Sequence, residues 1–216
     1  FFILCIATLI NGMNFIDGTN GNIVFTSLSI LAILYGLAAQ LGDNEVMRLT
    51  MLFALPLALF IPFNYPLGKL FAGDLGAYLC GATVAFTVIY FFGRHPEISA
   101  WNAVLVVFYP TMELMYSIAR KVLTQKSPFL PDREHLHIKL FIIFNRGSNK
   151  PRLSNNLVTL MLSVFWLWPV VIIPWVYQSH LLLFSSLVFL TGAYIALNRF
   201  IPAIETENTE TENRGD

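Results

Sequence analysis

The sequence predicts an all-α protein, a polytopic bundle of transmembrane helices, and three observations support this fold class. Hydrophobic residues make up 56% of the chain and charged residues only 12%, whereas a soluble domain usually carries about 25% charged residues. The mean hydropathy is +0.65, and apolar runs approach the roughly 20 residues that a helix needs to cross a bilayer. The alternating segments of about ten residues that would indicate a transmembrane β-barrel do not occur in the sequence.

Six apolar segments predict about six full spans, and the beginning of the chain predicts the end of one further helix. The six segments are residues 22–41, 48–63, 75–92, 99–119, 157–177 and 181–200, and residues 1–11 form the partial span. Pro56 and Pro62 are expected to kink or end the shortest of these helices, because proline lacks a backbone donor. We therefore expect one transmembrane domain over residues 1–200.

Both ends of the chain depart from this pattern. The chain begins at Phe1 without an initiator methionine and without the basic flank of a signal peptide, so we expect it to be the C-terminal part of a longer protein. Residues 205–216 are rich in Glu, Thr and Asn and contain no apolar side chain. The tail 201–216 is therefore expected to be disordered.

Basic residues predict the orientation in the membrane. Eight of the thirteen Lys and Arg fall within residues 120–152, so by the positive-inside rule the loop 120–156 is cytoplasmic. Counting spans backward places residues 11–21 and 64–74 on the cytoplasmic face, and residues 42–47 and 93–98 on the external face. Because the net charge is zero, nothing favours binding of nucleic acid.

The first polar cluster is residues 11–21, which contain three Asn, three Gly and Asp17. Glycines allow tight turns and a close backbone approach to a ligand. Asn and Asp side chains supply the hard oxygen donors that suit Mg²⁺. The alternative is an ordinary turn between helices, since Asn, Asp and Gly dominate turns.

The second polar cluster is residues 72–76, at the predicted cytoplasmic start of a span. As a metal ligand, Asp74 would act beside bound phosphates, because Mg²⁺ commonly binds through one or two carboxylates and substrate phosphates. The alternative is that Asp74 serves only as the N-cap of the helix.

The third polar cluster is residues 131–139, which combine His135 and His137 with Arg133 and Lys139. Arg and Lys suit phosphate, and Arg can bind it through two parallel hydrogen bonds. A zinc site and a plain solvated basic loop are the alternatives. Outside the clusters, Glu113 is the one acidic residue deep in a predicted span, where it faces a polar cavity or bonds to a neighbouring helix.

The three clusters together resemble the polyprenyl-phosphate N-acetylhexosamine-1-phosphate transferases, the glycosyltransferase 4 family. The matching strings are N-x-x-N-x-x-D-G-x-N-G at residues 11–21, A-G-D-L-G at residues 72–76 and P-D-R-x-H-x-H at residues 131–137. They occur in the same order as in the family. The third string is more similar to the WecA-like branch than to the branch that uses UDP-MurNAc-pentapeptide. The resemblance covers the chain up to about residue 200.

The resemblance implies a reaction at the cytoplasmic face of a bacterial inner membrane. A sugar 1-phosphate, with GlcNAc 1-phosphate as the expected group, would pass from a UDP-sugar to undecaprenyl phosphate with release of UMP, and so initiate a lipid-linked cell-envelope glycan such as O-antigen. The implied cofactor is Mg²⁺, with Mn²⁺ as the alternative ion. The implied partners are the UDP-N-acetyl sugar and the undecaprenyl phosphate lipid, and a homodimer is left open.

The resemblance also implies roles for individual residues. Asn14 and Asp74 are the expected metal ligands. The expected catalytic residues are Asp17, Asp74, His135 and His137. The expected substrate-binding residues are Asn11, Asn20, Arg133 and Lys69.

The chain departs from the family pattern at three points. Ile138 stands where the family often has a third His, and Asn20 replaces an Asp found in many bacterial members. The Asp-Asp motif of the family's N-terminal helices would lie before Phe1, so this chain alone is expected to be inactive. A catalytically degenerate paralogue and a membrane transporter are therefore kept as alternatives; a transporter would place ionisable residues and broken helices near the middle of the membrane.

Overall fold

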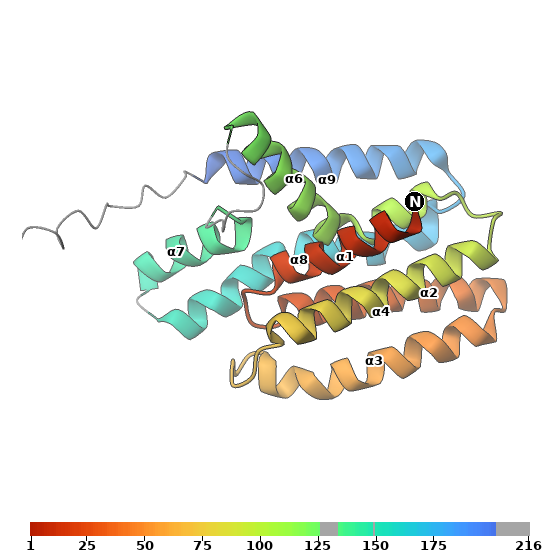
Figure 1. Cartoon of the computed structure of the whole chain (residues 1–216), viewed down its shortest axis with the longest axis horizontal. Coiled ribbons are helices and arrows are strands. Elements are labelled where there is room, and N and C mark those ends of the chain that lie inside the picture. The colour runs from red at the N-terminus through yellow and green to blue at the C-terminus, as the bar shows by residue number, and fades with distance from the viewer. Residues whose placement is uncertain (126–133, 149, 202–216) are drawn as a thin grey trace, which may run out of the picture.

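The structure is a computed structural model that describes residues 1–125, 134–148 and 150–201 (Figure 1). These parts of the chain are helical and contain no strand. The helices are α1 (Phe2–Ile16), α2 (Asn22–Leu41), α3 (Asn44–Asn64), α4 (Gly73–Arg94), α5 (Trp101–Val106), α6 (Phe108–Leu123), α7 (Leu136–Ser148), α8 (Pro151–Val176) and α9 (His180–Phe200). The predicted all-α membrane bundle is confirmed.

Five of the described helices, α2, α3, α4, α8 and α9, are long and apolar enough to cross a membrane, and α1 is a shorter apolar helix. The predicted span at 99–119 differs, because it is divided into α5 and α6 at Val107, whose φ of −100° and ψ of 20° interrupt the helix. Pro110 gives a physical reason: it has no N–H to donate to the carbonyl of Val106, four residues earlier.

Helix α3 is longer than the sequence analysis predicts. It begins at Asn44 because Asp43 caps it, accepting hydrogen bonds from the backbone N–H groups of Glu45 and Val46, each at 3.1 Å. Pro56 and Pro62 both lie inside the helix, so Pro56 does not end it.

The predicted loop 120–156 is largely helical in the part that the structure describes. It contains α7, and α8 begins at Pro151, six residues before the predicted start of that span. Proline is favourable at the first position of a helix, where its missing N–H costs nothing. The predicted tail lies outside the described residues except for Ile201.

Close helix contacts in the centre of the bundle depend on small residues. Helix α1 packs mainly against α4 and α6, and α2 packs against α3 and α8. A Cβ at Gly81 of α4 would lie 2.6 Å from the Cα of Ile10, and a Cβ at Gly12 of α1 would overlap the carbonyl of Pro110 in α6. These glycines therefore allow α1 to lie directly against both neighbours.

The polar segments lie at two opposite ends of the bundle. Figure 1 shows the α1–α2 loop, the α3–α4 loop and α7 at one end, and the α2–α3 and α4–α5 loops at the other. The first two polar clusters and the described part of the third, residues 134–139, therefore share one end. Residues 131–133, including Arg133, lie outside the described residues.

Candidate active site

The first two clusters meet where α1 ends and α4 begins. The side-chain amide of Asn14, in the last turn of α1, donates to Oδ1 of Asp74 at 3.3 Å. Asp74 lies in the first turn of α4, whose N-cap residue is Ala72 and has no capping side chain. The alternative that Asp74 merely caps the helix is therefore wrong, and its carboxylate is available to neighbouring segments.

Asp17 directly follows α1 and lies beside the same helix end. Burial is the main reason that the pKa of Asp17 is raised from 3.8 to about 6, and the charge of Asp74 adds to it. A hydrogen bond from the backbone of Gly73 acts in the opposite direction. The carboxylates of the half-buried Asp17 and the exposed Asp74 thus lie at the same helix end.

This donor set fits a hard divalent cation. Asp17 and Asp74 offer carboxylate oxygens, and Asn14 carries an amide oxygen next to them. Within the described residues, neither carboxylate forms an ion pair, so a bound cation would relieve their repulsion. Mg²⁺ is held by few carboxylates together with waters and phosphates. The two predicted metal ligands, Asn14 and Asp74, are brought together, and Asp17 joins them.

The histidines of the third cluster contact the first cluster. The ring of His135 packs edge-on against Phe15 with centroids 4.7 Å apart, and stacks with His137 at 5.8 Å and 11°. A Cβ at Gly18 would overlap Nε2 of His137. Three segments that are far apart in the sequence therefore converge at one end of the bundle.

The burial of His137 determines the charge of its imidazole ring. Burial lowers the pKa of His137 from 6.5 to about 4, so this imidazole is neutral near neutral pH. A neutral ring offers hydrogen bonds without a positive charge. His137 therefore adds no positive charge for a diphosphate.

Asn20 has a structural role that the sequence analysis does not foresee. It is 2% exposed, and its amide donates to Oδ1 of Asn156 at 2.9 Å. Its backbone N–H donates to Asn155, and its carbonyl accepts from Thr159 at 2.6 Å. Asn20 therefore fixes the α1–α2 loop to α8, and its expected contact with substrate stays a prediction.

The other predicted substrate-binding residues lie on the rim of this end. Asn11 is exposed one turn before Asn14, with its amide bonded to the carbonyl of Ala7. Lys69 is exposed in the α3–α4 loop, where its backbone N–H donates to the carbonyl of Phe63 at 2.8 Å. Their roles stay predictions.

The sequence analysis missed several residues that build this end of the bundle. Asn64 is 1% exposed: its Oδ1 accepts from the backbone of Gly21 at 2.6 Å, and its amide donates to Leu70 at 2.7 Å. The pair Asn155–Asn156 at the start of α8 anchors the α1–α2 loop. In the sequence, each of these residues is an Asn near the end of an apolar span. Such an Asn is ordinarily expected to face solvent, so the sequence did not indicate its buried hydrogen bonds.

Glu113 bonds to neighbouring helices, which decides between its two predicted environments. It accepts hydrogen bonds from Tyr194 in α9 and from His135 just before α7. A buried carboxylate with several donors needs no aqueous cavity.

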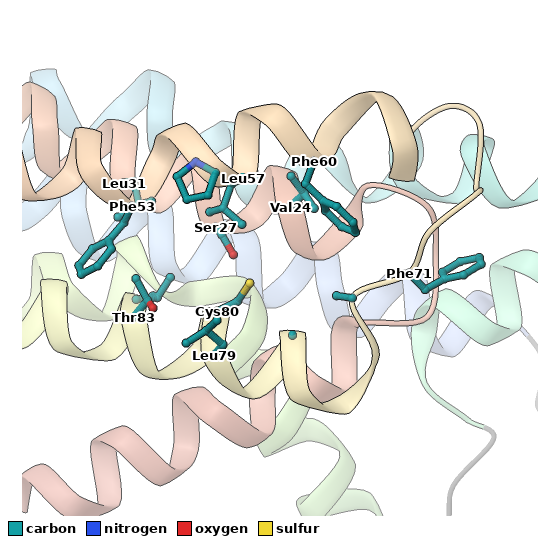
Figure 2. Close-up of a pocket in the computed structure, with 14 residues that line it drawn as sticks. Val24, Ser27, Leu31, Phe53, Leu57, Phe60, Phe71, Leu79, Cys80 and Thr83 are labelled. Carbon is teal, nitrogen blue, oxygen red and sulfur yellow. The ribbon is translucent and has the colours of Figure 1, made fainter.

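An apolar cavity of about 460 Å³ lies between α2, α3 and α4 (Figure 2). Ser27 and Cys80 point toward each other across it, and Phe71 and Gly76 line the end next to Asp74. Cys5 and Cys80 are both free cysteines. The lining of the cavity thus includes Gly76 in the first turn of α4, the turn that also carries Asp74.

Comparison with known proteins identifies similar sequences. Residues 1–92 match the model of glycosyl transferase family 4. The undecaprenyl-phosphate alpha-N-acetylglucosaminyl 1-phosphate transferase of Thermotoga maritima is 28% identical over 63% of this chain and 41% of its own length. The decaprenyl-phosphate N-acetylglucosaminephosphotransferase of Mycobacterium tuberculosis is 29% identical over 63% of this chain and 39% of its own length.

A third relative is the undecaprenyl-phosphate alpha-N-acetylglucosaminyl 1-phosphate transferase of Escherichia coli, 29% identical over 59% of this chain and 36% of its own length. The chain thus spans about two fifths of the curated relatives that it matches. No solved structure matches it. With its apolar helices, the chain is a multi-pass membrane protein similar to bacterial enzymes.

Proposed function

We infer that the chain is a member of glycosyl transferase family 4, whose model matches residues 1–92, and from this premise we propose that it acts as a polyprenyl-phosphate sugar-1-phosphate transferase. The proposed donor is UDP-N-acetylglucosamine, and the proposed acceptor is undecaprenyl phosphate. The products are the polyprenyl diphosphate sugar and UMP. The lipid product would begin a cell-envelope glycan such as O-antigen.

One observation carries the proposal: Asn14, Asp17 and Asp74 meet at one end of a membrane bundle beside His135 and His137. An excess of carboxylate oxygen next to imidazoles suits a reaction between phosphates. The position at a bundle end also suits the two substrates, because one is a lipid with a phosphate head and the other is a soluble nucleotide. The proposed location is the cytoplasmic face of the inner membrane.

The proposed reaction is a displacement at phosphorus. A phosphate oxygen of the lipid attacks the β-phosphorus of the UDP-sugar, a new P–O bond forms, and the bond between the β-phosphorus and the bridging oxygen breaks. UMP leaves with that oxygen. Positioning and charge stabilisation account for most of the catalysis in such transfers.

The residues of the site divide this work. Asp17, Asp74 and the amide oxygen of Asn14 would hold Mg²⁺, or Mn²⁺ in its place. The ion, when bound, neutralises charge on the diphosphate. The imidazoles of His135 and His137 orient the diphosphate by hydrogen bonds, and Arg133 and Lys69 supply positive charge toward the UDP-sugar.

The test is a reconstitution of the full-length protein in detergent with UDP-GlcNAc, undecaprenyl phosphate and Mg²⁺. We expect UMP release that requires all three, and other UDP-N-acetyl sugars in parallel reactions identify the donor. The same reaction is run with Asp74→Asn, for which we expect a loss of UMP release, and with Glu45→Gln, at the opposite end of the bundle, as the matched control for loss of a carboxylate. UMP release that continues without the lipid, or no release with any of these sugars, contradicts the proposal.

A further inference from the structure

Glu113 is a buried carboxylate, and both of its oxygens accept hydrogen bonds from other segments of the described chain. It is 2% exposed, and three donors from two other segments point at it. Oε1 accepts from the backbone N–H of Leu136 and lies 3.1 Å from Nδ1 of His135, while Oε2 accepts from the hydroxyl of Tyr194 at 2.6 Å. The carboxylate thus joins α6, the start of α7 and α9.

The hydrogen bond between Glu113 and His135 determines which ring nitrogen of His135 carries a proton. An ionised carboxylate only accepts hydrogen bonds, so Nδ1 of His135 must carry the proton between the two atoms. Nε2 lies on the opposite side of the imidazole ring and is directed away from Glu113. Among the described residues, nothing bonds to Nε2 of His135. This nitrogen is therefore left available for a ligand.

The same contact holds the ring beside the proposed site. The backbone bond from Leu136 to Glu113 fixes the first residue of α7, so both His135 and His137 are placed relative to α6. Helix α6 is itself fixed against α1, because Gly12 admits the carbonyl of Pro110. The His135 ring then packs on Phe15, one residue after Asn14.

We infer that Glu113 is a positioning residue for the transfer reaction: it sets the tautomer and orientation of His135 so that Nε2 faces the phosphates of the substrate. This inference rests on the proposed function. Buried carboxylates behind ligand-binding histidines act in this way in metal sites, where their loss typically costs about 10- to 100-fold. Tyr194, in turn, holds the second oxygen of Glu113 and keeps the carboxylate from rotating.

A double-mutant cycle tests the inference in the full-length protein. Glu113→Gln keeps the size of the side chain and removes its charge, and we expect kcat to fall about 10- to 100-fold with little change in KM. In a His135→Gln background, the same substitution should cost less than about 2-fold, because its effect passes through His135. An equal loss in both backgrounds overturns the inference and leaves Glu113 as a support of the fold.

A second readout does not depend on activity. Nitrogen NMR of the wild-type protein with ¹⁵N-labelled histidine, assigned through His135→Gln, reports which nitrogen of His135 is protonated. We expect Nδ1 to carry the proton, and an unprotonated Nδ1 overturns the inference. If the wild-type protein transfers no sugar phosphate, the proposed function fails, and the state of His135 in wild type and Glu113→Gln still decides whether Glu113 positions it.

Discussion

Both ends of the bundle carry a polar cluster that contains aspartate, but the partners of the aspartate side chains differ between the two ends. At the end away from the candidate site, Asp43 is buried between the side chains of Arg94 and His95. Oδ2 of Asp43 lies 2.8 Å from Nε of Arg94 and 3.0 Å from Nε2 of His95. At the site end, Asp17 and Asp74 lie together, and neither forms an ion pair with a described residue.

The pKa values of the two clusters differ accordingly. The hydrogen bond from Arg94 holds the pKa of Asp43 well below its usual range, with help from the backbone of Val46 and from His95. Burial raises the pKa of Asp17 to about 6. In this protein, the aspartates of the candidate site (the unbalanced end) thus have no described ion-pair partner, whereas the aspartate at the opposite end (the balanced end) has one. The comparison makes four predictions, which differ in the size of the expected effect.

The largest effect is expected from Asp74→Asn, which removes one charge from the unbalanced end. We expect UMP release to fall at least about 100-fold, because the substitution removes a proposed metal ligand. We expect the melting temperature to be unchanged or higher, because a repulsion between carboxylates is lost. Full activity in this variant would show that the unbalanced end is not the site.

Asp43→Ala should give the converse result at the balanced end. The substitution removes the cap of α3 and leaves Arg94 and His95 without their shared partner. We expect a loss of about 1–3 kcal/mol in the free energy of unfolding, which combines a lost cap with a broken, solvent-screened ion pair. UMP release per folded molecule should be retained. Thermal unfolding and activity are measured on the same preparation, and a selective loss of activity would contradict the structural role.

Gly18→Ala tests whether the first and third clusters meet at the site end. The added methyl group would overlap Nε2 of His137, so the ring must move. We expect UMP release to fall about 10-fold, because small displacements of catalytic groups are costly. Gly192→Ala is the control, since a Cβ there meets nothing within 4 Å. Unchanged activity in Gly18→Ala would mean that His137 does not need its observed position.

The smallest expected effect is the pH dependence of the stability that Asp43 contributes. Because the pKa of Asp43 is lowered in the folded state, its stabilisation is fully present above the ordinary value of 3.8 and is lost as the pH falls through the folded pKa. Asp43→Asn cannot titrate. We therefore expect the stability gap between wild type and Asp43→Asn to shrink between about pH 5 and about pH 3. A gap that stays constant over this range contradicts the pairing with Arg94.

The fold class and the location of the site could be predicted from the sequence because both follow from local differences in hydropathy along the chain. An apolar run predicts a span by itself, and Asn14, Asp17 and Asp74 stand out because they interrupt such runs. Hydropathy did not reveal the break at Val107, because the residues on both sides of this short interruption are apolar.

The partners of buried polar groups were out of reach for another reason. Glu113 bonds to His135 and Tyr194, which are 22 and 81 residues away, and Asn20 bonds to residues more than 130 positions away. No local pattern encodes such pairs, because they depend on how the helices pack. For the same reason, the sequence could not show that Asp43 is balanced by Arg94 while Asp74 is not balanced.

Titration of the full-length protein with Mg²⁺, followed by its melting temperature, tests the central comparison most directly. A ligand that binds the folded state raises the melting temperature with concentration. We predict a rise for the wild-type protein and for Asp43→Asn, and no rise for Asp74→Asn, because the cation is held only at the unbalanced end. An equal rise in Asp74→Asn and wild type would contradict the account.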